Sequence, residues 1–184
     1  MKSYKNKTRL FQTVIISLLI TIGFASNANA DDVDQRKRAA RHPLTSAEQL
    51  NALAKDDEWE VRRSVASNRR APAELLHFLA KDNDERIRIT VITNTATADK
   101  THLSLVNDPS LEVRSVLARY EYTTPAVMDK LAQDKSAEIR IEVAKNWNTS
   151  FVTLKRLIKD EFADVSNTAS RELTNRKLQQ NQAE

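Results

Sequence analysis

Four arginines recur along this 184-residue chain at a constant spacing of 26 residues: Arg62, Arg88, Arg114 and Arg140. Guanidinium groups bind carboxylates and phosphates through charge-assisted hydrogen bonds, so a row of them is a possible track for an anionic ligand. An aspartate series has the same spacing: Asp56, Asp82, Asp108 and Asp134. We expect each arginine to pair with the aspartate of its own repeat or of the next one. These eight residues then form a structural arginine–aspartate ladder.

A second group of residues departs from the repeat in the loops that follow its second half. Tyr120 stands where other copies have asparagine, and Tyr122 and Trp147 occupy loop positions in neighbouring copies. Aromatic residues and arginine carry much of the binding energy at protein interfaces. We expect a partner-binding edge here, and local packing of the loops is the alternative explanation. The candidate residues of this edge are Tyr120, Tyr122, Trp147, Arg119, Arg69 and Arg70.

Other residue types give no convincing catalytic or metal site. The three histidines, His42, His77 and His102, fall at three different repeat positions, and the chain has no cysteine. The lack of cysteine excludes thiol catalysis, cysteine metal sites and disulfides. Acidic pairs such as Asp56–Asp57 precede helices, where capping explains them better than acid–base catalysis. We therefore predict no catalytic residue, no metal, no cofactor and no enzymatic activity.

The elements that position these residues are short helices. Apolar residues in the first half of a copy follow i, i+3, i+4 spacing, as in Leu50, Leu53 and Ala54. The second half has i, i+4 pairs such as Val113 and Leu117. Each copy predicts two helices of about nine or ten residues, or one helix and a shorter 3₁₀-like turn. Isolated helices of that length are marginal in water, so stacking between copies must stabilise them.

Local signals predict where the helices begin and end. Asp108–Pro109 predicts an N-cap followed by proline at the first helical position, and Thr124–Pro125 predicts the same. Thr45 and Glu48 have the spacing of a capping box. The second helices should end at periodic asparagines, because asparagine tolerates the left-handed conformation that ends many helices. These asparagines are Asn68, Asn94 and Asn146.

The copies organise most of the chain into one all-α domain. Five full copies of the repeat cover residues 45–173, and a half copy precedes them. We expect an α-solenoid of two-helix repeats over residues 31–176, followed by a polar C-terminal tail at residues 177–184. Solenoids of short repeats usually present extended surfaces to partners.

Residues 1–30 have the order of a secretory signal peptide. Basic residues precede an apolar stretch from Phe11 to Phe24, and Ala28–Asn29–Ala30 is a small-x-small cleavage site. The apolar stretch is shorter than the roughly 18 residues of a membrane-spanning helix, and no cysteine is present for lipid attachment. We expect cleavage before Asp31 and an exported, soluble protein, periplasmic or secreted, with no membrane span in the mature chain and no lipid anchor.

Removal of that segment changes the charge balance. The full chain has 29 Lys and Arg against 25 Asp and Glu, and four of the cations lie in residues 1–30. The remaining 25 cations and 25 acids give a net charge of zero. A basic footprint is the usual mark of nucleic-acid binding, so we do not expect nucleic acid as a partner.

Segments such as LAKDDEWEVRRSVASN and LAQDKSAEIRIEVAKN share a pattern of Leu-Ala-x-Asp, then Val-Arg or Ile-Arg, then Val-Ala-x-Asn. This pattern resembles the leucine-rich repeat variant family, which is close to HEAT-like helical repeats. The resemblance covers nearly all of the chain after residue 30 and implies a right-handed superhelix of short helices. Some members of that family carry a cysteine cluster for an iron–sulfur centre, which does not transfer to a chain without cysteine. HEAT-like families are mostly binding scaffolds, with a few enzymes and lyase subunits, so the resemblance implies fold more strongly than function.

These observations favour an exported, non-enzymatic scaffold or adaptor that binds a protein or peptide partner through its solenoid surface. Two alternatives remain open at this point. One is an enzyme or lyase-like subunit that uses a concave groove. The other is a protein that binds an anionic envelope polymer or lipid headgroup along the arginines.

Overall fold

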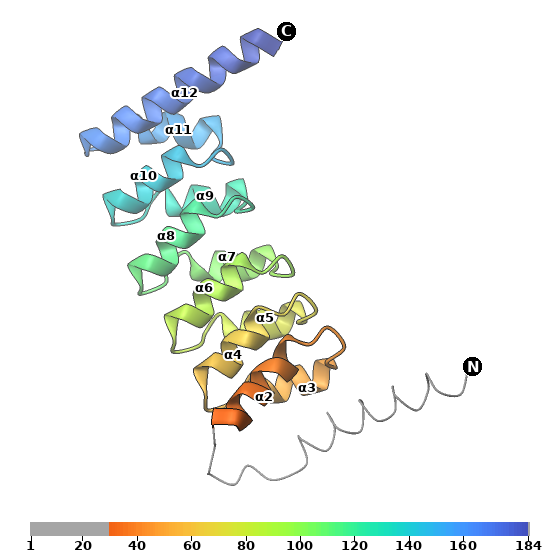
Figure 1. The fold of residues 1–184 in the computed structure, drawn as a ribbon. Coiled ribbons are helices and arrows are strands. Elements are labelled where there is room, and N and C mark those ends of the chain that lie inside the picture. The colour runs from red at the N-terminus through yellow and green to blue at the C-terminus, as the bar shows by residue number, and fades with distance from the viewer. Residues whose placement is uncertain (1–29, 184) are drawn as a thin grey trace. The chain divides into compact units, whose positions relative to one another are not determined.

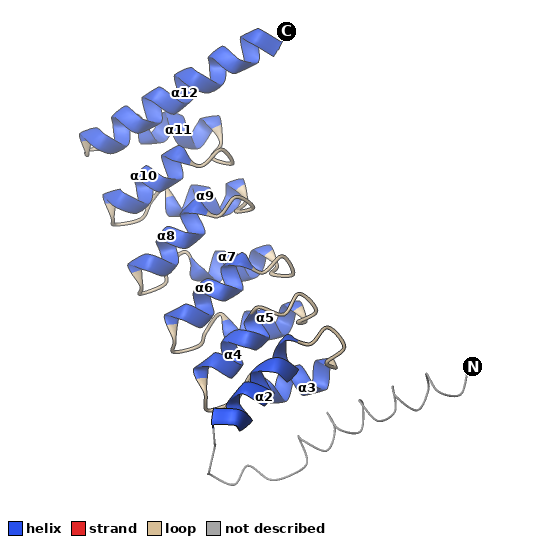
Figure 2. Ribbon diagram, in the orientation of Figure 1, coloured by secondary structure: helices blue, strands red, loops and turns tan. Residues whose placement is uncertain are grey.

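The computed structural model describes residues 30–183, and these residues are helical without any strand (Figure 1, Figure 2). Eleven α-helices follow one another in this range. They belong to two compact units, of which the first ends at Ala71 and the second begins at Pro72. The predicted signal peptide lies outside the described residues, except for Ala30, where α2 begins.

The first unit contains three helices: α2 (Ala30–Arg41), α3 (Ala47–Leu53) and α4 (Trp59–Ala66). Helix α2 is the predicted half copy, and it packs against both α3 and α4, which form the first full copy. Ala40, Leu50, Val61 and Val65 are completely buried between these helices. The i, i+4 pair of α4 therefore faces the core, as the sequence predicts.

The second unit consists of four helix pairs. They are α5 (Ala73–Leu79) with α6 (Glu85–Thr93), α7 (Asp99–Leu105) with α8 (Leu111–Arg119), α9 (Pro125–Leu131) with α10 (Ala137–Lys145), and α11 (Phe151–Leu157) with α12 (Ala163–Ala183). Second helices pack on one another in chain order, α6 on α8, α8 on α10 and α10 on α12 (Figure 1). Both halves of each copy are α-helical, so the two-helix alternative is confirmed and the 3₁₀-like turn is wrong. The chain is a helical solenoid of two-helix repeats.

The periodic apolar residues form the core of the second unit. Ile87, Val113, Ile139 and Val165 are completely buried on successive second helices. Burial of such a side chain contributes about 1.5–3 kcal/mol relative to exposure. Helices of seven to nine residues cannot hold their conformation alone in water, so this burial between copies stabilises them.

The periodic aspartates lie just before the second helices and are not their N-caps. In α8 the N-cap is Ser110, whose side chain accepts a hydrogen bond from the Val113 amide, and Pro109 lies outside the helix. The predicted cap at Asp108–Pro109 is therefore wrong. Asp108 Oδ1 accepts a hydrogen bond from the Ser110 amide at 2.9 Å, and each of the other periodic aspartates accepts one from the amide two residues on. This turn leaves the second carboxylate oxygen for an arginine.

The first helices begin by different means. Ser46 and Gln49 form a capping box at α3, so the prediction for Thr45–Glu48 is wrong by one residue. The Thr45 hydroxyl donates instead to the carbonyl of Ala39 at 2.5 Å. Thr124–Pro125 begins α9 with Thr124 as N-cap, as predicted.

The periodic asparagines do not adopt the left-handed conformation that the sequence predicts. Asn94 and Asn146 have φ values of −79° and −70° with extended ψ, and no residue in the described range has positive φ. Their side chains serve the backbone instead. Asn68 Nδ2 donates to the Ala40 carbonyl at 2.8 Å, and Asn146 Nδ2 donates to the Ala118 carbonyl at the same distance. Each asparagine thus ties the end of its helix to the end of the preceding second helix.

Helix α12 closes the second unit and is 21 residues long. Val165, Ala169 and Leu173 are its buried apolar residues, and the outward side chains are mostly polar. The helix continues to Ala183, so the predicted polar tail from residue 177 is part of α12 over the described residues. Among the helices of residues 30–183, none has the length and apolar character needed to cross a membrane.

Candidate functional site

Each ladder arginine of the second unit is bonded on two sides. Arg88 donates from Nε and Nη2 to the Asp108 carboxylate at 2.7 and 2.8 Å, and from Nη1 to the Asp82 carbonyl at 2.7 Å. The same arrangement recurs in the pairs Arg114–Asp134 and Arg140–Asp160, with Nε–Oδ2 distances of 2.6 and 2.7 Å. Each arginine therefore binds the side chain of the next copy's aspartate and the backbone of its own copy.

The first unit contains the same contacts. Arg36 Nε donates to Asp56 Oδ2 at 2.8 Å, and Arg62 Nη1 donates to the Asp56 carbonyl at 2.8 Å. Arg36 is missing from the ladder predicted above, although it lies one full repeat before Arg62 and the register alone indicates its place.

The guanidinium groups of the ladder arginines in the second unit are buried as well as paired. Arg88, Arg114 and Arg140 are at most 8 % exposed. Hydrogen bonds to the facing carboxylates raise the pKa of Arg88 and Arg140, and the hydrogen bond from Arg140 lowers the pKa of Asp160. An anionic ligand on this track would have to displace the aspartates from buried pairs, which is costly.

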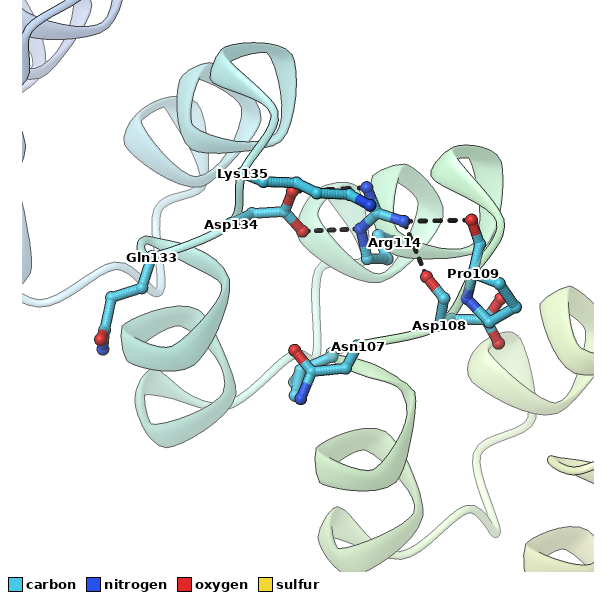
Figure 3. Close-up of a pocket in the computed structure, with 8 residues that line it drawn as sticks. Asn107, Asp108, Pro109, Arg114, Gln133, Asp134 and Lys135 are labelled. Atoms are coloured by element: carbon cyan, nitrogen blue, oxygen red, sulfur yellow. Dashed lines mark hydrogen bonds and ion pairs between the residues drawn. The ribbon is translucent and has the colours of Figure 1, made fainter.

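A polar groove of about 360 Å³ lies beside one rung of the ladder (Figure 3). The loops before α8 and α10 form it, and its lining residues are Val106, Asn107, Asp108, Pro109, Arg114, Gln133, Asp134 and Lys135. Figure 3 shows the Lys135 side chain extending toward the Arg114–Asp134 pair, with Gln133 pointing away from it. Because the Arg114 guanidinium is already bonded to Asp134 and to the Asp108 carbonyl, Lys135 is the cation that this groove offers to solvent.

The aromatic residues of the candidate edge divide into one anchor and two exposed rings. Tyr122 is 63 % exposed and Trp147 is 69 % exposed, whereas Tyr120 is half-buried. The Tyr120 ring meets the Tyr122 ring edge to face, with centroids 5.5 Å apart. On its other side Tyr120 meets the buried ring of His102 at 5.8 Å. A chain of three rings therefore leads from the core to the surface.

His102 lies beneath this edge and was not among the candidate residues of the sequence analysis. It is 4 % exposed and stands where the other copies have Leu50, Leu76, Met128 and Leu154. Its Nε2 lies 3.1 Å from the Ile92 carbonyl, so Nε2 carries the proton, and Nδ1 is buried without a hydrogen-bond partner among the described residues. Burial lowers the pKa of His102. Its departure from a leucine position was the available signal.

The replacements at residues 102 and 120 compensate each other. Where a copy has asparagine, that side chain donates to a carbonyl at the end of the preceding second helix, as Asn146 does to Ala118. Tyr120 cannot donate to the equivalent carbonyl, which belongs to Ile92. His102 supplies that donor instead. A buried carbonyl without a partner would cost about 1–3 kcal/mol, so the histidine removes the penalty that tyrosine at residue 120 would otherwise bring.

Hydrogen bonds hold the two loops that carry the exposed rings. Asn148 Nδ2 donates to the Glu121 carbonyl at 2.6 Å, which joins loop 146–150 to loop 120–124. Arg176 of α12 donates to the carbonyls of Asn146 and Trp147 at 2.8 and 3.1 Å. Tyr122 and Trp147 are thus exposed side chains on a fixed backbone.

The cations of the predicted edge are all exposed. Arg119 ends α8 and reaches Glu112 at 3.3 Å in an exposed ion pair. Arg69 and Arg70 belong to the first unit, where both are exposed, and their part in partner binding stays a prediction. Lys145, at the position of Arg119 one copy later, is a cation that sequence analysis left out, and it pairs with Glu142 at 2.9 Å.

The histidines have separate surroundings. His42 Nδ1 accepts a hydrogen bond from the Leu44 amide, and His77 Nδ1 lies 3.2 Å from the Thr101 hydroxyl. Within residues 30–183, no group of three or more histidine, aspartate or glutamate side chains has the arrangement of a metal site.

No protein-family model matches the chain, and no curated protein matches it. Among solved structures, it is similar to a crystal structure of an engineered protein, with 16 % identity over 88 % of this chain and 96 % of that one and a TM-score of 0.43. It is also similar to a leucine-rich repeat variant with a novel repetitive structural motif, with 22 % identity over 86 % of this chain and 71 % of that one and a TM-score of 0.39. Both scores are low, so the fold rests on the helix pairs described above, and membership of the leucine-rich repeat variant family stays a prediction.

Proposed function

We propose that this protein is a non-enzymatic scaffold that binds a protein or peptide partner through loops 120–124 and 146–150 of its second unit. The observation that carries the proposal is the compensated replacement at residues 102 and 120. A fold that needed only stacking would keep leucine and asparagine there. Instead, His102 provides the hydrogen bond to the Ile92 carbonyl, and Tyr120 packs against the exposed ring of Tyr122.

The exposed rings have the properties of interface residues. Tyrosine and tryptophan lose little conformational freedom on binding and bury large areas, which is why they dominate binding hot spots. The loops beneath Tyr122 and Trp147 are already fixed by hydrogen bonds. A partner therefore need not order them, and that lowers the cost of association.

The arginine ladder gives less support to an anion-binding function. Its guanidinium groups are bonded to carboxylates and to backbone carbonyls and are nearly inaccessible in the second unit. Export remains part of the proposal, because residues 1–30 carry the signal-peptide pattern. The partner would then be a component of the cell envelope or of the extracellular medium.

The test is recovery of partners from an envelope fraction by the mature protein and by the variant Tyr122→Ala, Trp147→Ala. We expect the variant to fold normally, because both side chains are largely exposed, and to lose the partners that the wild type recovers. Phe78→Ala is a matched control, since Phe78 on α5 is 51 % exposed and lies outside these loops. Equal recovery by the wild type and the double variant would refute the proposal.

A further inference from the structure

The edge around the exposed rings carries excess positive charge. It comprises segments 119–123, 145–149 and 171–177, which begin at equivalent positions of successive copies. They contain five cations and two acids. Two further acids, Glu112 and Glu142, pair with Arg119 and Lys145 from just outside the segments, so the surplus is one positive charge. The cations are Arg119, Lys145, Arg171, Arg176 and Lys177, and the acids are Glu121 and Glu172. Residues 72–184 as a whole have 16 cations and 17 acids, so the edge is slightly more positive than the unit that carries it.

Two of these cations are held only by weak pairs. Arg119 and Glu112 have side chains that are 52 % and 59 % exposed, and Lys145 is 50 % exposed beside Glu142. Exposed ion pairs contribute about 0–1 kcal/mol, so a carboxylate from a partner can replace the present acid at little cost. Arg176 differs, because its guanidinium is committed to backbone carbonyls.

Several backbone carbonyls at this edge are already bonded to side chains. The carbonyls of Ala118, Tyr120 and Glu121 accept hydrogen bonds from Asn146 or Asn148. Those of Trp147 and Thr149 accept hydrogen bonds from Arg176. The exposed side chains of this edge are therefore the more accessible groups for recognition.

The repeat spacing fits an extended ligand. Stacked helices are generally about 8–10 Å apart, and an extended chain advances about 3.3 Å per residue. Equivalent positions of neighbouring copies are thus about three residues apart along such a ligand. Arg119 and Lys145 are equivalent positions, and Tyr122 and Trp147 differ from equivalence by one residue.

We propose that this edge binds an acidic, extended segment of a partner protein, with carboxylates facing Arg119 and Lys145 and an apolar side chain against Tyr122 or Trp147. This inference rests on the proposed function and adds the chemistry of the partner. The exposed, weakly paired Arg119 and Lys145 select acidic residues, and the exposed rings select an apolar or aromatic residue among them.

The experiment is selection of random twelve-residue peptides displayed on phage against the mature wild-type protein. We expect the selected peptides to be enriched in Asp and Glu together with Leu, Phe or Trp. Binding of a selected peptide should weaken at least about tenfold in the variant Arg119→Glu, Lys145→Glu, since charged rim residues govern such encounters. The control Lys155→Glu, Lys159→Glu changes the net charge equally, at the end of α11 opposite loop 146–150, and should leave binding unchanged.

Other outcomes separate this inference from the proposed function. Peptides that lose affinity in Tyr122→Ala, Trp147→Ala but lack acidic residues would overturn the acidic partner and retain the binding edge. Selection of no peptide would overturn the inference, and the recovery of envelope partners would then judge the proposed function alone. Binding to phosphatidylglycerol vesicles that is lost in Arg119→Glu, Lys145→Glu, with no peptide selected, would assign these cations to a membrane surface.

Discussion

Returning residues 102 and 120 to the types found in other copies should give non-additive changes in stability. The variants are His102→Leu, Tyr120→Asn and the two combined. His102→Leu alone removes the donor that satisfies the Ile92 carbonyl. Tyr120→Asn alone introduces a second donor for that carbonyl and removes the ring that packs against His102. Only the combined variant restores one donor, one acceptor and an apolar residue in the core.

The magnitude follows from one buried hydrogen bond. Ile92 is completely buried, and an unsatisfied carbonyl there costs about 1–3 kcal/mol. His102→Leu also removes the unpartnered Nδ1, which offsets part of that cost, so the single variants alone do not decide the question. The coupling energy between the two changes decides it, because the variants differ in which side chain donates to the Ile92 carbonyl. We expect the free energy of unfolding of the combined variant to exceed, by about 1–3 kcal/mol, the value obtained by adding the effects of the two single changes.

Denaturant unfolding of the four proteins measures this coupling. Circular dichroism and tryptophan fluorescence should give coincident transitions, which establishes that free energies of unfolding are comparable. The control cycle combines His102→Leu with Tyr122→Asn, the same replacement at an exposed tyrosine two residues on, and should be additive within about 0.5 kcal/mol. Additivity in the test cycle as well would refute the idea that His102 compensates for Tyr120. The combined variant should also lose envelope partners while remaining folded, because it lacks the ring that supports Tyr122.

Three further outcomes are expected. Arg114→Ala should lower the free energy of unfolding by about 3–5 kcal/mol, because it leaves the buried carboxylate of Asp134 without its partner. Arg119→Ala should lower it by about 0–1 kcal/mol, because that pair is exposed. Equal small losses in denaturant melts would contradict the ladder geometry. Stability should fall as the pH drops below about 6.5, because the unfolded chain binds a proton that buried His102 resists, and the decline should be shallower in His102→Leu when both are melted across pH 5–8. Intact mass of the exported protein should correspond to a chain that begins at Asp31, and a retained N-terminus would remove the argument for export.

The constant period of the repeat accounts for most of what the sequence predicts correctly. Buried aliphatic residues at one spacing require that each copy present the same face to its neighbours. Charged residues with the same spacing must then meet across that face, and Arg88 does meet Asp108. The period alone did not determine which of two aspartates binds the Arg88 side chain. Asp82 and Asp108 both lie close to Arg88, and the structure gives the carbonyl of one and the carboxylate of the other.

Cap assignments were less predictable, because two short residues compete at each helix start. Asp108 and Ser110 are both good N-cap types, and only one residue can hold the cap geometry. Asp108 also has to face Arg88, so its carboxylate forms the preceding turn and Ser110 takes the cap. The contact with Arg88 of the neighbouring copy thus determines which residue caps the helix, and the local sequence around Asp108 does not reveal that contact.

The positions that depart from the repeat show why a site could form at this edge. The constraint is a carbonyl at the end of each second helix, which needs a donor, and asparagine is one solution. At residue 120 the donor comes from His102. At residue 172 Glu stands at the asparagine position, and Arg176 donates to the Asn146 carbonyl, the counterpart of the Tyr120 carbonyl that Asn146 reaches at 3.2 Å. Where another residue supplies the donor, the asparagine position can hold a side chain that folding does not require. Both freed positions lie on the edge that displays Tyr122 and Trp147, so the same exchange that keeps the backbone satisfied makes room for residues that can serve a partner.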